Sequence, residues 1–301
     1  MTTITADAGI VAPLAEAPSL PATLHMGAVR LRVRDAARSI AFYTGTVGLT
    51  LLGRTAEGIV RLGAGDEVVV ELEEAPEARP RPRGTTGLFH VAILVPDRPS
   101  LAVVLNRLIA QGVRIGASDH LVSEALYFDD PDGNGIEIYR DRPADEWNWD
   151  GRTVEMATYP LDLRGLLADL PATATVGTPM PAGTRVGHVH LQVGEIARAR
   201  HFYVDLLGFE LTTDRYPGAL FVSAGHYHHH LGLNIWQSRG GGPAPAGSVG
   251  LVHFEVVLPD ATAVEALRAR ILAAGESVVP VEGGFAIADP WGTRLHVLSR
   301  V

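Results

Sequence analysis

Short segments in which apolar and polar side chains alternate recur along the chain, and they predict β-strands. Three of these segments carry an ionisable residue on the polar face: His90 in GLFHVAILVPD, Glu137 in DDPDGNGIEIYRD and His188 in RVGHVHLQV. Side chains two residues apart in a strand share one face of the sheet. Each strand is therefore expected to turn one apolar face to a core and one polar face to a cleft.

The alternating segments belong to longer phrases that repeat. AVRLRVRDAARSIAFYTGTVGLTLL (28–52) returns as HVHLQVGEIARARHFYVDLLGFELT (188–212), and GLFHVAILVPDRPSLAVVLNRLIAQGV (87–113) returns as GLVHFEVVLPDATAVEALRARILAAGE (250–276). Each copy begins with an alternating strand, continues as an amphipathic helix and is followed by short strands around Gly-containing turns. The pattern predicts an α+β protein of four βαβββ units, at roughly 27–75, 87–140, 186–237 and 249–301.

The repeats also predict how the chain is divided. Residues 1–24 are rich in Pro and Ala and are expected to be a disordered lead. Residues 25–142 would form a first domain from units one and two, and residues 185–301 a second domain from units three and four. Between them, residues 143–184 form a long connector, in which Trp147 and Trp149 are expected to fix the connector to the body.

Composition narrows the function classes. Of 301 residues 47% are hydrophobic and 20% are charged, which is typical of a soluble globular protein. A net charge of −9 disfavours nucleic acid as a partner, and the absence of Cys excludes disulfides and thiolate ligands. No apolar run is long enough to span a membrane, and the N-terminus lacks the pattern of a secretory signal. We therefore expect a cytoplasmic protein.

Particular phrases resemble a known family. FYTGTVGL and FYVDLLGF follow the pattern F-Y-x(4)-G-[LF], and from residue 25 onward the four units resemble the vicinal-oxygen-chelate superfamily. That superfamily includes glyoxalase I, bleomycin-resistance proteins and type I extradiol dioxygenases. ASDHLVSEALYFDDPDGNGIE, DEWNWDG and AGHYHHHLGLNIWQSRG are similar to its catechol-2,3-dioxygenase branch. The resemblance implies four βαβββ units paired into two vicinal-oxygen-chelate domains with curved mixed sheets.

Two imidazoles and one carboxylate are the ligand set that holds non-haem iron(II) and leaves positions open for substrate and O₂. The resemblance implies a metal site built from two facing units, and His90 and Glu137 of unit two with His188 of unit three supply that set. Unit one has Ala28 where the matching His would stand. We therefore expect units two and three to face each other, and Fe(II) as the metal, with Mn(II) or Zn(II) as alternatives.

A rival ligand set exists in unit four. His253 matches His90, and His296 matches Glu137. Pairing units three and four would give His188, His253 and His296, and three imidazoles suit zinc at least as well as iron.

Further residues are expected around the metal. Tyr127 lies where similar extradiol enzymes have a tyrosine that hydrogen-bonds a substrate hydroxyl, and His120 lies near the pocket mouth. Read as a strand, HHHLGLNIW turns His228 and His230 into the cleft and His229 away from it. His230 is then the expected acid–base residue, and His190 a residue of the pocket wall.

The resulting hypothesis is an iron(II) extradiol dioxygenase that opens the ring of a catechol, with a small aromatic diol and O₂ as partners and a homo-oligomeric state. Two alternatives remain. One is a metal-dependent isomerase or lyase of the glyoxalase kind, which would want a second carboxylate ligand, and LGLNIWQ in unit three has none. The other is a non-catalytic protein that binds aromatic ligands or drugs.

Overall fold

The computed structural model describes residues 19–300. The first half of the chain contains two βαβββ units, each with one main helix and four strands. Unit one consists of β1 (His25–Val33), α1 (Ala36–Phe42), the π-helical turn η1 (Tyr43–Val47), β2 (Thr50–Arg54), β3 (Val60–Ala64) and β4 (Glu67–Glu74). Unit two consists of β5 (Gly87–Leu94), α2 (Arg98–Ala110), β6 (Gly116–Asp119), β7 (Ser123–Asp129) and β8 (Gly135–Asp141).

The second half repeats this order. Unit three consists of β12 (Arg185–Gln192), α4 (Ile196–Arg200), the π-helical turn η3 (His201–Leu206), β13 (Glu210–Thr213), β14 (Ala219–Ser223) and β15 (Leu231–Asn234). Unit four consists of β16 (Gly250–Leu258), α5 (Ala261–Ala273), β17 (Val279–Val281), β18 (Gly284–Ala288) and β19 (Arg294–Ser299). The α+β class and the four predicted units are therefore confirmed.

Aspartates position the first turns of the helices. Asp35, Asp97 and Asp260 are extended residues directly before α1, α2 and α5, and each side chain accepts a hydrogen bond from the backbone N–H three residues later. These bonds satisfy N–H groups that have no partner within the helix. Among the described residues, no helix is long and apolar enough to cross a membrane.

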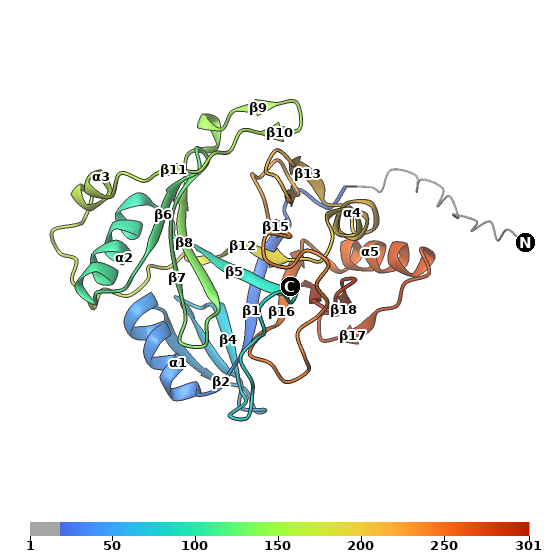
Figure 1. Ribbon diagram of the computed structural model, residues 1–301, viewed down its shortest axis with the longest axis horizontal. Helices are drawn as coiled ribbons and strands as arrows, with labels where there is room; N and C mark the ends of the chain where they lie inside the picture. The colour runs from blue at the N-terminus through green and yellow to red at the C-terminus, as the bar shows by residue number, and fades with distance from the viewer. Residues whose placement is uncertain (1–18, 301) are drawn as a thin grey trace, which may run out of the picture.

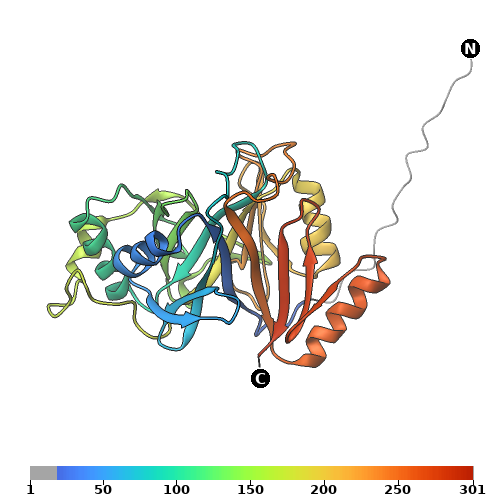
Figure 2. The same cartoon turned by 90° about the horizontal axis from the view of Figure 1, so that it is seen from below.

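Two mixed sheets join the halves of the chain. The nine-stranded sheet has the order β11-β6-β7-β8-β5-β12-β15-β14-β13, so units two and three share it. The eight-stranded sheet has the order β17-β18-β19-β16-β1-β4-β3-β2 and is shared by units one and four. In Figure 1 the helices α1–α3 lie on one side of the sheets, and α4 and α5 on the other; Figure 2 shows the same arrangement from below. Each sheet therefore crosses the division predicted between residues 142 and 185.

Within each half, a buried tyrosine connects the two units. The hydroxyl of Tyr43, in the first F-Y phrase, donates to Asp130 Oδ2 at 3.1 Å, and the hydroxyl of Tyr203 in the second donates to Asp289 Oδ2 at 3.1 Å. Both aspartates lie in the turn before the last strand of the next unit. Burial raises the pKa of Asp130, and this hydrogen bond opposes the shift. Units one and two, and units three and four, are thus linked by a polar contact inside the core.

The segments outside the units are more ordered than the sequence suggests. Of the predicted disordered lead, residues 1–18 lie outside the described residues, but Leu20 and Leu24 are buried in the core, so disorder is wrong for residues 19–24. The connector contains η2 (Ala144–Glu146), the hairpin of β9 (Trp149–Asp150) and β10 (Thr153–Val154), β11 (Tyr159–Pro160) and α3 (Leu163–Ala168). Its strand β11 extends the nine-stranded sheet next to β6.

Tyr43→Phe should lower the free energy of unfolding by about 1–3 kcal/mol, since it removes one donor from a buried carboxylate. Chemical denaturation measures the change. Tyr159→Phe is the control, because that side chain is 57% exposed. Equal losses from the two variants would show that the bond between Tyr43 and Asp130 does not connect the units.

Candidate metal centre

The register of the nine-stranded sheet brings three ionisable side chains together. Ala92 of β5 pairs with Glu137 of β8 on one side and with His188 of β12 on the other. His90 lies two residues from Ala92 on the same face, whereas Val91 and Ile93 on the opposite face belong to the hydrophobic core. The alternation read from the sequence is therefore correct in β5. Because Ala92 carries only a methyl group, the side chains on either side of it can meet above the strand.

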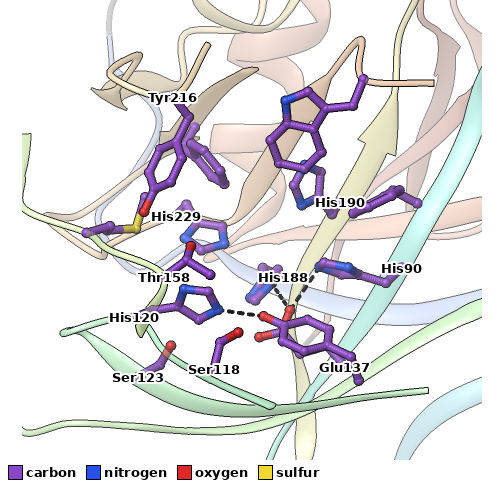
Figure 3. A pocket seen from close by; sticks show the side chains of 15 residues that line it. His90, Ser118, His120, Ser123, Glu137, Thr158, His188, His190, Tyr216 and His229 are labelled. Atoms are coloured by element: carbon purple, nitrogen blue, oxygen red, sulfur yellow. Dashed lines mark hydrogen bonds and ion pairs between the residues drawn. The ribbon is translucent and has the colours of Figure 1, made fainter. Parts of the chain in front are cut away.

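The three side chains converge on a small volume. The Oε2 atom of Glu137 lies 2.9 Å from His90 Nε2 and 3.1 Å from His188 Nε2, and one donor atom from each residue lies within 4.8 Å of the others (Figure 3). All three residues are buried. Among the described residues, this is the single cluster of three or more such side chains with this geometry.

The donor set fits a divalent metal. Burial lowers the pKa of His188, so this imidazole is neutral and offers a lone pair. The buried His90 Nε2 atom has no properly oriented hydrogen bond, although it faces the carboxylate. A buried nitrogen without a partner costs free energy, which a bound cation would remove. The predicted ligands His90, Glu137 and His188 are thus brought together.

The rival ligand set is not brought together. His253 and His296 lie in the eight-stranded sheet and His188 in the other. The rings of His253 and His296 are stacked, with centroids 3.7 Å apart and planes at 11°. Among the described residues, neither ring belongs to a cluster of three possible ligands. The expectation of a site from His188, His253 and His296 is wrong, because units three and four do not share a sheet.

Tyr127 and His120 form a connected pair beside the ligands. Tyr127 pairs with Glu137 across β7 and β8, and its hydroxyl lies 2.7 Å from His120 Nε2. His120 Nδ1 lies 2.6 Å from the carbonyl oxygen of Ala157, which can only accept. The Nδ1 atom therefore carries a hydrogen, and Nε2 of the neutral ring accepts from Tyr127. Burial, followed by the charge of Glu137, raises the pKa of Tyr127 well above its usual value, so the phenol stays protonated.

The prediction for the three consecutive histidines is wrong in orientation. His229 lines the cavity above the ligands, whereas His228 and His230 do not. Residues 228–230 form a bend, and β15 begins only at Leu231, so strand alternation does not apply to them. His230 Nδ1 instead accepts from Ser223 Oγ at 2.9 Å and from the Ala224 amide. His228 Nε2 is directed at Asp141.

The cavity next to the ligands has a volume of about 220 Å³ and mostly apolar walls. His190, predicted to be a wall residue, lines it, and its ring lies 5.0 Å from Phe89 and 5.6 Å from Trp236. Met156 and Thr158 of the connector also line the cavity. Sequence reasoning missed these two because connector residues carry no repeat pattern. Their one signal is proximity to the DEWNWDG phrase.

The connector is fixed to the bend that carries the histidines. Trp149 stacks on His226 with ring centroids 3.7 Å apart, and the Trp147 ring lies 5.6 Å from Tyr227 and 5.1 Å from His228. The expectation that both tryptophans attach the connector to the body agrees with these contacts.

Comparison with known proteins identifies the family. The model of the Glyoxalase/Bleomycin resistance protein/Dioxygenase superfamily matches residues 25–138 and 185–297. The chain belongs to this superfamily.

Individual relatives agree with the superfamily assignment. The chain is 44% identical to a catechol-2,3-dioxygenase of Bacillus subtilis over 271 residues, which cover 88% of this chain and 94% of that protein. The structure is similar to glyoxalase I from Zea mays, with a TM-score of 0.56, 19% identity and 92% of both chains covered. It is also similar to the cppA protein of Streptococcus pneumoniae, with a TM-score of 0.57, 12% identity, and 92% of this chain and 99% of that one covered. At these identities the two structures support the fold alone.

Glu137→Ala should abolish stoichiometric metal binding while the fold is kept, since it removes the one carboxylate among three ligands. Metal content after anaerobic loading with Fe(II) and circular dichroism measure the two properties. Full metal occupancy in this variant would exclude the cluster as the metal centre.

Replacement of His253 and His296, in the eight-stranded sheet, is expected to leave metal binding unchanged. The double variant His253→Gln/His296→Gln should retain the metal content of the unchanged protein, because neither ring approaches Glu137. Loss of metal from this variant, with metal retained in His90→Ala, would move the metal centre to the other sheet.

Proposed function

We propose that this protein is an iron(II)-dependent extradiol dioxygenase that uses O₂ to cleave the ring of catechol or a substituted catechol. The observation that carries the proposal is the convergence of His90, Glu137 and His188 at the base of a small aromatic-lined cavity. The 44% identity to a protein named catechol-2,3-dioxygenase supports the same reaction class. A metal held by these three ligands would supply a template that binds both hydroxyl oxygens of the diol and leaves room for O₂.

Two residues on the cavity wall suit the hydroxyl groups of a diol. The Tyr127 hydroxyl donates to His120, which leaves its oxygen lone pairs free to accept from a substrate hydroxyl. His229 uses Nδ1 in a bond to His228, and within the described residues its Nε2 makes no hydrogen bond. A diol carries two hydroxyl hydrogens, and the cavity thus offers an acceptor for each of them.

His229 is the residue best placed to move a proton. It lines the cavity, and its ring packs 4.2 Å from that of His188, so it lies next to the ligand cluster. Burial lowers the pKa of His229 well below its usual value, which keeps the ring neutral before substrate binds. A neutral imidazole can take a hydroxyl proton at Nε2 and return it to an oxygen of the product. We therefore assign to His229 the acid–base role that the alternation pattern gave to His230.

The walls of the cavity favour an uncharged ring. Among the described residues, no Lys or Arg lines the cavity, so a carboxylate on the substrate would find no counter-charge there. Phe89, Phe221 and Trp236 provide aromatic surface on which a flat ring can pack. The proposed substrates are therefore catechol and its small uncharged derivatives.

The two alternative functions lack a supporting feature. A glyoxalase-type isomerase would want a second carboxylate ligand, whereas the cluster contains one carboxylate. A non-catalytic binding protein has no need for His229 or for a buried, partly unsatisfied ligand set. Oxygen uptake by the iron-loaded protein on addition of catechol, with identification of the product, tests the proposal, and catechol binding without oxygen uptake would favour the non-catalytic alternative.

His229→Phe should bind iron as the unchanged protein does and bind catechol more weakly, since one hydroxyl acceptor is lost. Its turnover should fall much further, by about 10²–10⁴-fold, since acid–base assistance is removed. His230→Phe should keep turnover per folded molecule and lose stability, because it removes a buried acceptor from Ser223. Iron content, anaerobic catechol affinity, kcat and thermal unfolding distinguish the two. Loss of turnover from His230→Phe alone would restore His230 as the acid–base residue.

A further inference from the structure

A hydrogen-bonded chain leads from His229 away from the cavity to a partly exposed carboxylate. His229 Nδ1 lies 2.7 Å from His228 Nδ1, and His228 Nε2 lies 2.8 Å from Asp141 Oδ1. The side chain of His228 is fully buried, while that of Asp141 is 22% exposed. Neither His228 nor Asp141 lines the cavity. The hydrogen bonds connect both of them to the cavity through His229.

We propose that Asp141 and His228 are positioning residues that fix the tautomer of His229, so that its Nε2 atom presents a lone pair to the cavity. The proposal rests on the acid–base role proposed for His229. It extends that role by naming the two residues that prepare it.

The proposed directions of the hydrogen bonds start from the Asp141 carboxylate and take the His228 ring as neutral. A carboxylate only accepts, so the hydrogen between Asp141 and His228 lies on Nε2 of His228. In a neutral ring the other nitrogen, Nδ1, then has a lone pair and accepts from Nδ1 of His229. With its single hydrogen on Nδ1, His229 has an unprotonated Nε2. The resting ring is thus prepared to accept a substrate proton and not to donate one.

The surroundings hold both positioning residues in place. Asp141 lies on β8 two residues beyond Tyr139 and four beyond Glu137, so the strand that supplies the ligand also supplies the carboxylate on the same face. Tyr227 donates to Asp141 Oδ2 at 3.0 Å, and Tyr139 in turn lies 2.8 Å from the Tyr227 hydroxyl. Because Tyr227 gives its hydrogen to Asp141, Tyr139 must be the donor in the second bond. One oxygen of Asp141 is thereby occupied, and the other is directed at His228.

The backbone of the bend is fixed as well. Thr212 Oγ1 donates to the carbonyl oxygen of His228 at 2.7 Å. On its other side the His228 ring faces Trp147, with centroids 5.1 Å apart. The bend is therefore held from β13 and from the connector, which keeps the His228 ring between the carboxylate and His229.

The tautomer can be read directly by nitrogen NMR. In protein labelled with ¹⁵N-histidine and loaded with Zn(II) as a diamagnetic probe, the ring signals of His229 are assigned by their loss in His229→Phe. The unchanged protein should show His229 with its hydrogen on Nδ1. A hydrogen on Nε2 of His229 in the unchanged protein would overturn the proposal.

Variants test whether Asp141 and His228 set this state. Asp141→Ala and His228→Phe should each shift His229 towards the other tautomer and lower kcat of the iron-loaded protein by about 10-fold or more. Metal content should stay unchanged, and anaerobic catechol affinity should fall less than kcat. Asp141→Asn should keep much of the His229 tautomer and of kcat that Asp141→Ala loses, since its amide oxygen can still accept from His228. An unchanged tautomer and kcat in Asp141→Ala would contradict the proposal.

Tyr227→Phe is the matched control, because it removes one bond to Asp141 and leaves the bond to His228 intact. Its tautomer signal should change less than that of Asp141→Ala, because the carboxylate that accepts from His228 is still present. The tautomer experiment does not depend on turnover. A protein with the inferred tautomer but no catechol-dependent oxygen uptake would therefore refute the proposed function and leave the positioning role standing.

Discussion

The site depends on the pairing of β5 with β8 on one side and β12 on the other. Glu137 and His188 come from different halves of the chain and meet because both pair with Ala92. A shift of one residue in either pairing would turn the ligand on that strand to the core face. The hydrophobic alternation opposes such a shift, since Val91, Ile93, Ile136, Ile138, Val189 and Leu191 would then leave the core. The burial of apolar side chains on one face therefore fixes the geometry of the polar face.

The two sheets show how the same fold can carry or lack a metal cluster. In the eight-stranded sheet, Glu255 pairs with His296 as Ala92 pairs with Glu137. The Glu255 carboxylate accepts a hydrogen bond from the Ala28 amide at 2.9 Å. At this position of the eight-stranded sheet a long side chain therefore occupies space that the short side chain of Ala92 leaves open in the nine-stranded sheet. The neighbouring Arg30 is paired with Glu71 at 2.7 Å. Charges in this sheet are thus satisfied by one another, whereas the cluster of the other sheet keeps a buried nitrogen unsatisfied.

The sequence was sufficient to predict the features that follow from regular periodicity. The four units and the polar faces that carry His90, Glu137 and His188 follow from alternation and from repeated phrases. The partnership of units two and three, and with it the convergence of the three side chains, was expected from the resemblance to the vicinal-oxygen-chelate superfamily. The prediction failed at His228–His230, where three identical residues precede an apolar strand. Alternation predicts the direction of a side chain only inside an extended strand. Residues 228–230 form a bend before the strand that begins at Leu231, so counting back from Leu231 gives the wrong face for them. The hydrogen bond from Thr212 to the His228 carbonyl, which holds the bend, joins residues that no local pattern relates.

The buried polar groups around the cluster explain why the connector is ordered. His228 and His229 are buried and His120 is partly buried. All three need partners, because an unpaired polar group in the interior costs about 1–3 kcal/mol. The connector supplies the partner of His120 through the Ala157 carbonyl, and its Trp147 side chain covers the His228 ring. Removing the connector would expose these hydrogen bonds to water, which would compete for the same donors and acceptors. The strands form the polar face of the site, and the connector, which has no repeat pattern, covers that face and excludes water from it.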